Sequence, residues 1–135
     1  FVSIMRTKYA KYKEYHTSLD NLNFVSKLGF ENSINVYKEL IEIIETNCFY
    51  KANQLCEPML IKYNLRSDNL QNVNFKIKNL NNLDLNISNF LAYADGKNDL
   101  IDLSLKLNIK YKEILKVAKI LVSFDLIKEM NSDAV

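Results

Sequence analysis

Apolar and polar residues in the first part of the chain predict a strand, a loop and a short helix. Residues 1–5 are almost wholly apolar and precede Arg6, a pattern that predicts a short buried strand. Residues 7–20 are polar, aromatic and charged, which predicts a loop that leaves this strand. The apolar residues of the next stretch recur every third position, and Gly29 predicts where that helix ends. They are Leu22, Val25 and Leu28.

A longer helix is predicted for residues 32–47, and Asn32 or Ser33 could cap its start. Its apolar face consists of Ile34, Tyr37, Leu40, Ile41 and Ile44. Residues 48–82 show no regular spacing and become rich in asparagine, which competes with helix by bonding the backbone locally. We therefore predict a loop there, with one short strand at residues 73–77.

Three short helices are predicted for the last part of the chain. They cover residues 85–94, 99–107 and 111–124, and a short strand follows at Leu126 and Ile127. Asn98 would cap the second helix, and Asn108 would supply a tight turn because asparagine tolerates the left-handed conformation. Three short helices with a tight turn before the last one are typical of a winged helix-turn-helix.

The predicted fold class is a mainly α piece of an α/β parent domain, followed by a winged helix-turn-helix. A lone buried strand cannot pair its own backbone groups or cover both of its faces. We therefore expect the rest of its sheet to lie upstream of Phe1. Residues 1–79 would be the strand-loop-helix tail of the α/β domain, and residues 80–135 the winged helix. The unpaired strand edge also predicts a homo-oligomer.

Composition narrows the class of protein. The chain has 135 residues, of which 48% are hydrophobic and 25% charged, as expected for a folded chain rather than a disordered one. No apolar run approaches the roughly 20 residues that a membrane span requires, so no membrane partner is expected. The two cysteines, Cys48 and Cys56, do not form a disulfide framework, which favours a reducing, cytoplasmic location.

The single histidine, His16, limits the chemistry available. A complete zinc site needs several ligands at recognisable spacing, and a catalytic triad would need partners that this sequence does not offer. The ordinary alternative is a polar surface histidine. However, His16 follows a predicted strand and loop, where ligands and catalytic groups often lie. As a metal ligand it would donate its other ring N–H to Asp20, Tyr15 or a backbone carbonyl.

The segment around His16 resembles a known family. The sequence RTKYAKYKEYHTSLDNL, followed by a helix and CEPML, is similar to the end of a bacterial aminopeptidase-like domain of unknown function related to the M28 zinc peptidases. That family carries R-S-K-Y-G-x-F-x-E-Y-H-T-S-L-D-N-L and then E-P-x-L-G-K-R-G-L-Y-P. Glu57, Pro58, Leu60, Lys62 and Leu65 match the second motif, whereas Ile61, Tyr63, Asn64, Arg66 and Ser67 depart from it. The family ends in a winged helix whose first helix closes with Y-x-D-G, as residues 93–96 do.

The resemblance implies a zinc-dependent aminopeptidase-like hydrolase. It makes His16 the last zinc ligand, whereas the remaining ligands and the general base would lie upstream. This chain alone would therefore contain no catalytic residue, would not bind zinc by itself and would be inactive. The implied partners are the upstream part of the same protein and a peptide or small amide substrate. Relatives often accompany surface-polysaccharide biosynthesis.

Three further assignments stay open. Glu57 is either a substrate contact or part of a turn after the long helix. The alternative function is that of a non-catalytic scaffold that binds a protein partner. A DNA-binding regulator is disfavoured: the net charge of the chain is only +2, and residues 80–135 carry seven lysines and eight acidic residues, 7 − 8 = −1. The lysines of the last predicted helix are Lys110, Lys112, Lys116 and Lys119.

Overall fold

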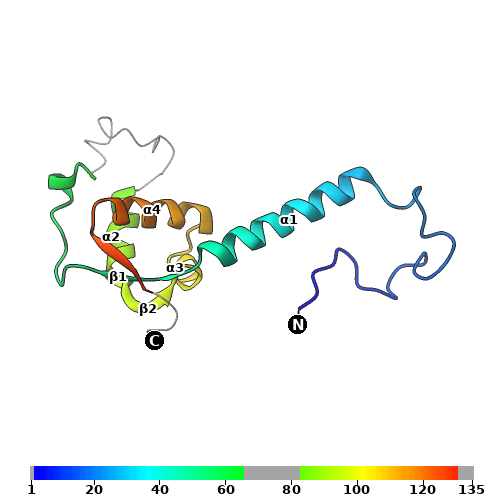
Figure 1. Ribbon diagram of the computed structural model, residues 1–135, viewed down its shortest axis with the longest axis horizontal. Coiled ribbons are helices and arrows are strands. Elements are labelled where there is room, and N and C mark those ends of the chain that lie inside the picture. The colour runs from blue at the N-terminus through cyan, green and yellow to red at the C-terminus, as the bar shows by residue number, and fades with distance from the viewer. Residues whose placement is uncertain (1, 66–82, 131–135) are drawn as a thin grey trace. The chain divides into compact units, whose positions relative to one another are not determined.

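The computed structural model describes residues 2–65 and 83–130, and the chain divides into two compact units between Glu45 and Thr46 (Figure 1). This division differs from the boundary predicted at residues 79 and 80. The reason is that the first strand, β1 (Phe49–Ala52), pairs with two strands that come after residue 90, so it belongs with the later residues. The strand predicted at residues 73–77 lies outside the described residues.

The first unit contains one long helix, α1 (Lys27–Thr46). It begins before the predicted residue 32, because Ser26 supplies the cap: its Oγ accepts a hydrogen bond from the Gly29 N–H at 3.1 Å. Asn32 and Ser33 therefore lie inside α1, and the latter donates to the Gly29 carbonyl at 3.0 Å. Gly29 was predicted to end a helix. Instead it lies in the first turn of α1.

The strand predicted at the start of the chain is wrong. Residues 2–5 belong to no helix or strand, and Val2 is 92% exposed. A strand needs a neighbour for its backbone groups, and within the described residues these four have none. The homo-oligomer expected from the sequence stays a prediction. The loop predicted for residues 7–20 is confirmed, since turns and bends fill it.

The second unit is built on a three-stranded antiparallel sheet with the order β2-β1-β3. The central β1 pairs with β3 (Ile127–Met130) from Phe49 opposite Met130 to Ala52 opposite Ile127. On its other side it pairs with β2 (Asp95–Asp99), with an irregularity in register between Phe49 and Lys51. The second unit is therefore a small mixed helix-and-sheet structure. Over the described residues of the whole chain, helices still hold most of the regular structure, in keeping with the mainly α piece that was predicted.

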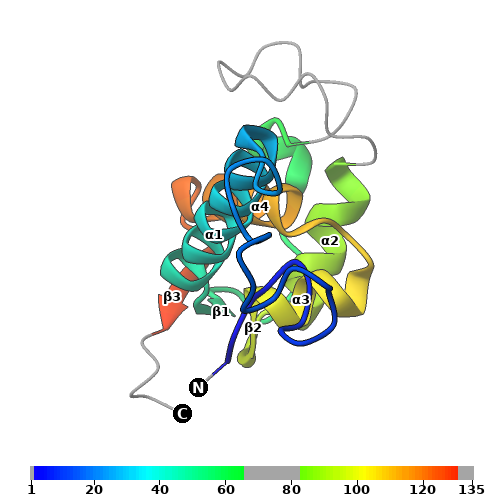
Figure 2. The same ribbon diagram turned by 90° about the vertical axis from the view of Figure 1, so that its right-hand side faces the viewer.

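Four helices accompany this sheet in the described residues: the 3-10 helix η1 (Leu60–Tyr63), α2 (Leu83–Tyr93), α3 (Leu100–Leu107) and α4 (Tyr111–Ser123). The last three confirm the three predicted helices within two residues or so at each end, and Figure 2 shows them beside the sheet. Asn108 is left-handed, as predicted, with φ 52°. The predicted cap is wrong, because Asp99 and not Asn98 caps α3: its side chain accepts from the Asp102 N–H at 2.8 Å.

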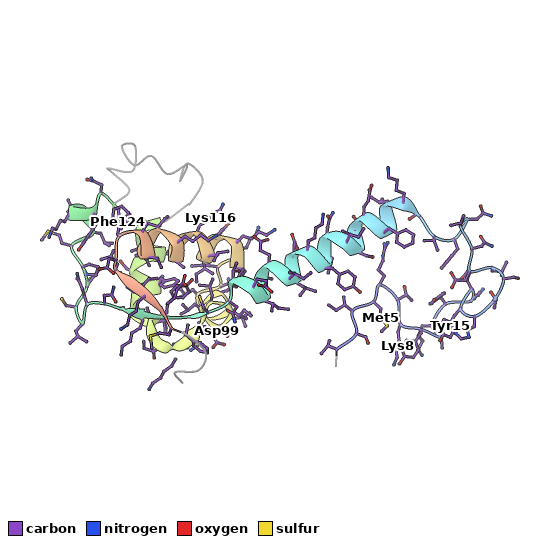
Figure 3. All side chains as sticks on the ribbon, viewed as in Figure 1. Met5, Lys8, Tyr15, Asp99, Lys116 and Phe124 are labelled. Atoms are coloured by element: carbon purple, nitrogen blue, oxygen red, sulfur yellow. The ribbon has the colours of Figure 1, made fainter. Side chains whose placement is uncertain are left out.

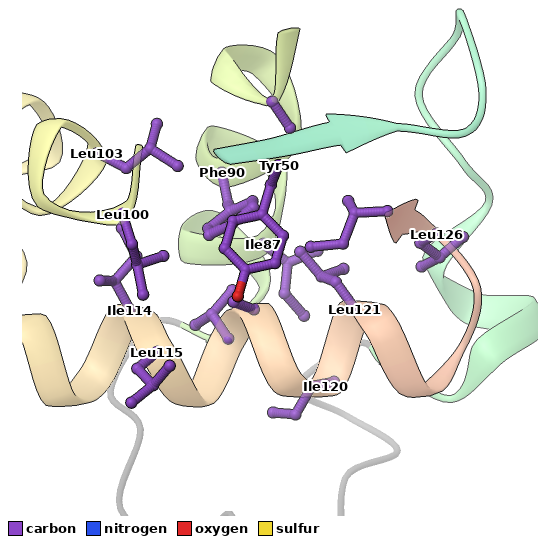
Figure 4. Packing of buried hydrophobic residues seen from close by; sticks show 14 of the residues in the cluster. Tyr50, Ile87, Phe90, Leu100, Leu103, Ile114, Leu115, Ile120, Leu121 and Leu126 are labelled. Atoms are coloured by element: carbon purple, nitrogen blue, oxygen red, sulfur yellow. The ribbon is translucent and has the colours of Figure 1, made fainter. Parts of the chain in front are cut away.

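The core of the second unit forms where α2 and α4 meet the face of the sheet from which Tyr50 projects. In Figure 4 the Tyr50 ring reaches from β1 toward α4 and lies beside Phe90 of α2. The two rings meet edge to face, with centroids 5.7 Å apart, a favoured arrangement. The α4 residues that contribute are Ile114, Leu115, Val117, Ala118, Ile120 and Leu121. Among the described helices of the chain, none is both long and apolar enough to cross a membrane.

Candidate functional site

His16, the predicted metal ligand, lies at the bend of a tight turn in the first unit. The turn closes where the Thr17 N–H donates to the Glu14 carbonyl at 3.1 Å, and the Thr17 hydroxyl donates to the same oxygen at 2.8 Å. This geometry holds the His16 backbone at φ 56°, a left-handed conformation that costs energy for a residue with a side chain. The result is an exposed imidazole on a backbone that local hydrogen bonds fix in place.

Aromatic rings surround this turn. The Tyr15 ring lies 4.3 Å from the His16 ring, between centroids, and meets Tyr12 edge to face at 5.6 Å. Tyr12 in turn stacks on Phe24 at 5.7 Å, and Figure 3 labels Tyr15 among the side chains of this segment. Of the predicted supporting residues, Tyr15 therefore contacts His16. Asp20 is exposed one turn later, where its N–H donates to the Thr17 carbonyl at 3.2 Å.

The side chains near His16 do not make a metal site by themselves. In residues 2–65 and 83–130, no group of three or more histidine, cysteine, aspartate and glutamate side chains comes together. Structural and catalytic zinc ions both require at least three protein ligands. His16 is thus one candidate donor, and zinc binding would need ligands from outside this group of residues.

Glu57, the predicted substrate-side residue, lies in the second unit on the loop between β1 and η1. Its Oε1 atom accepts a hydrogen bond from the Ser88 hydroxyl of α2 at 3.2 Å. The pair borders two open clefts, one of about 370 Å³ and one of about 490 Å³, and Pro58 beside them is buried. This hydrogen bond ties the loop to α2. The substrate contact of Glu57 stays a prediction.

Ser88 and two amides were not predicted as site residues. Gln54 and Asn89 line the same cleft as Glu57. Nothing in the local sequence distinguishes Ser88 or Asn89 from the other polar residues of α2, because their position depends on the packing of a distant loop. The one signal in the sequence that pointed to this cleft was Glu57, which matches the second family motif.

The exposed side of α4 carries lysines. Lys112, Lys116 and Lys119 are exposed at helical spacing, and Figure 3 labels Lys116 on this helix. Acidic residues at Glu113, Asp125 and Glu129 lie on the same part of the chain, in keeping with the net charge of −1 (7 − 8) counted for residues 80–135.

The two cysteines differ in environment. Burial raises the pKa of the Cys48 thiol, which makes it a poor nucleophile. Cys56 is exposed on the cleft loop. Both are free thiols, as the sequence analysis expected.

Comparisons with known families divide the chain near its unit boundary. The model of a domain of unknown function (DUF4910) matches residues 1–47, and the model of a winged helix-turn-helix matches residues 48–129.

One curated relative is similar along nearly the whole chain. It is an inferred polysaccharide biosynthesis protein with aminopeptidase-like domain from Clostridium acetobutylicum, 32% identical over 127 residues. The match covers 93% of this chain and 28% of the relative. The crystal structure of an inferred peptidase from the same organism is also similar, with 32% identity and a TM-score of 0.69 over 88% of this chain and 24% of that one. The chain thus spans about a quarter of the length of these proteins.

Proposed function

Through residues 48–129 the chain belongs to the winged helix-turn-helix family, and we propose that it serves as the winged-helix end of a zinc-dependent, aminopeptidase-like hydrolase. The observation that carries this proposal is the continuous likeness to one relative with an aminopeptidase-like domain, which runs through both units of the chain. In this proposal the chain contributes one ligand and an accessory module. The rest of the catalytic machinery comes from a larger body of the same protein, acting on a peptide or small amide in the cytoplasm.

The exposed surface of α1 supports a contact with the rest of such a protein. The helix has 20 residues and none of them is buried. Apolar residues nevertheless recur along it at helical spacing, and Ile44 is 70% exposed. The exposed members of this set are Ile34, Tyr37, Ile41 and Ile44. Because contiguous exposed apolar surface usually marks a contact, we assign this face to the remainder of the aminopeptidase-like domain.

His16 is the residue through which the chain would take part in the chemistry. Zinc, where bound, would polarise the scissile carbonyl and activate water. The described residues supply one imidazole, which is too few donors for the ion, so the function of the chain is to position that imidazole. The turn at Thr17 and the adjacent Tyr15 ring restrict the imidazole before any ligand arrives.

The test is the zinc content of the gene product that carries this chain, measured by mass spectrometry together with hydrolysis of an amino acid amide. His16→Asn removes the imidazole but keeps a residue that tolerates the left-handed backbone. We expect it to lower zinc content and to reduce hydrolysis by more than about 100-fold, since even outer partners of a ligand cost 10–100-fold. Lys13→Ala, an exposed change in the same loop, is the control and should leave both unchanged.

The competing function is a non-catalytic scaffold that binds a protein partner. The same experiment separates the two, because a scaffold would hold no stoichiometric zinc and would hydrolyse nothing. Unchanged zinc and activity in His16→Asn would also contradict the proposal, since His16 would then be an ordinary surface histidine.

A further inference from the structure

The two clefts beside Glu57 share a wall. Glu57, Pro58 and Ser88 line both of them, so the carboxylate stands where one cleft passes into the other. The hydrogen bond from Ser88 engages Oε1 and fixes the direction of the carboxylate, and a ligand would approach Oε2. A ligand lying across this wall would occupy both clefts at once.

The side chains that line the two clefts carry little charge. Of the described residues that line the two clefts, Glu57 alone is charged. Gln54, Ser88 and Asn89 add neutral hydrogen-bonding groups. A single carboxylate supported by neutral groups favours a cationic partner, because charge-assisted hydrogen bonds are the stronger ones.

Apolar side chains line part of the cleft on each side of the carboxylate. Those of the first cleft include Leu91, Ala92 and Leu126. The second is lined by Met59, Leu60, Ile61 and Leu85, three of which are about half exposed or more. Pockets of this size with apolar walls and a few polar groups are typical of ligand sites. The pattern is apolar, anionic, apolar.

We propose that this surface binds an extended peptide segment in which a cationic nitrogen lies between two apolar side chains. The nitrogen pairs with Oε2 of Glu57, and its aliphatic stem packs on the apolar wall, as lysine and arginine stems commonly do. The nitrogen is that of a lysine or arginine side chain. This inference requires neither zinc nor hydrolysis, so it stands apart from the function proposed above.

The test uses the whole chain and three short peptides in a buffer with EDTA, so that metal plays no part. Acetyl-Leu-Lys-Leu-amide carries the side-chain cation, and acetyl-Leu-norleucine-Leu-amide has a similar stem without charge. Leu-Leu-amide carries only the free amino end. Binding is measured by calorimetry, and by NMR shifts at Ser88 and Leu126 in the cleft. We expect the lysine peptide to bind at least about tenfold more tightly than the norleucine peptide.

Glu57→Gln is the decisive variant, because it keeps the shape of the side chain and removes its charge. We expect it to abolish the preference for the cation, whereas Glu129→Gln, an exposed carboxylate on β3, should retain it. Tighter binding of Leu-Leu-amide than of the lysine peptide would mean that the site prefers a free amino end, and would overturn the proposal. Equal binding of the charged and uncharged peptides, or a preference that survives Glu57→Gln, overturns the proposal.

Discussion

Asn47 and Asp99 are hydrogen-bonded to each other where β2 ends and α3 begins. The Asn47 Nδ2 atom donates to Asp99 Oδ2 at 2.9 Å, while Asn47 Oδ1 accepts from the Ile101 N–H at 3.0 Å. Asp99 Oδ1 accepts from the Asp102 N–H at 2.8 Å. Two side chains far apart in sequence therefore satisfy two of the unpaired N–H groups at the start of one helix.

This pair predicts coupled losses of stability. Asp99→Ala should lower the free energy of unfolding by about 1 kcal/mol, because it removes the helix cap. Asn47→Ala should cost a similar amount, and the double variant should cost less than the sum of the two single changes. Asp99→Asn keeps a capping oxygen but has no second acceptor for the Asn47 Nδ2 atom, so it should cost part of what Asp99→Ala costs. Urea unfolding of the wild type and the four variants measures all these values, and strict additivity would show that the two residues act independently.

Two leucines of α3 provide a matched test of the core. Leu103 is fully buried, whereas Leu105 is 75% exposed on the same helix. Leu103→Ala should therefore destabilise the protein by about 2–5 kcal/mol, through lost burial and the cavity left behind. Leu105→Ala should stay within about 0.5 kcal/mol of the wild type. Thermal or urea unfolding measures both, and similar costs for the two changes would contradict the described packing.

The buried phenol of Tyr50 predicts a loss of stability at high pH. Burial, followed by the hydrogen bond with Cys48, raises the pKa of Tyr50 well above its usual value of about 10. Above pH 10 the unfolded chain releases this proton while the folded chain keeps it, so the unfolded state binds fewer protons. The free energy of unfolding therefore falls as the pH rises, by up to about 1.4 kcal/mol per pH unit for one proton.

Urea unfolding between pH 8 and 11 measures this decline. Tyr50→Phe should make the curve shallower, because the titrating group is gone. Phe90→Leu perturbs the ring partner of Tyr50 but adds no titration, so it should keep the wild-type slope even if it lowers stability overall. A Tyr50→Phe curve parallel to that of the wild type would assign the decline to other groups.

The lysines of α4 predict weak, nonspecific contact with DNA. If Lys112, Lys116 and Lys119 each neutralised one phosphate, the logarithm of the binding constant would fall against the logarithm of salt with a slope no steeper than about −3. Fluorescence anisotropy with a labelled duplex at several salt concentrations measures this slope. A tight, sequence-selective complex with a much steeper slope would instead favour the regulator that the charge balance disfavours.

The helices of the second unit were largely predictable from the sequence. The apolar spacing of α3 and α4 has a period that only a helix satisfies, and Asn108 between them has few alternatives to a left-handed turn. Where the cap would lie was less clear, since Asn98 and Asp99 are both good capping residues and tertiary packing decided between them. Asn98 instead donates to the Tyr93 carbonyl at 3.2 Å and is almost buried in β2.

The strand predicted at Leu126 and Ile127 overlaps β3, but two other segments were misjudged for a physical reason. Residues 95–99, DGKND, have the composition of a turn, yet they form β2 because β1 offers them a partner. Residues 2–5 have the composition of a strand, yet no partner strand adjoins them among the described residues. Local composition therefore misjudged both segments, because strand pairing is decided by residues distant in sequence. The position of Glu57 against Ser88 depended on the same kind of distant contact.

The sheet order has a consequence for how the chain is made. The central strand, β1, is the first of the three to leave the ribosome, and β3, which completes its pairing, is the last. Until residues as late as Met130 have emerged, one edge of β1 has no partner and the Tyr50 side of the sheet cannot be completed. The second unit therefore acquires its cooperative fold only at the end of its own synthesis, and a ribosome stalled within α4 would hold a chain with an open, pairing-competent strand.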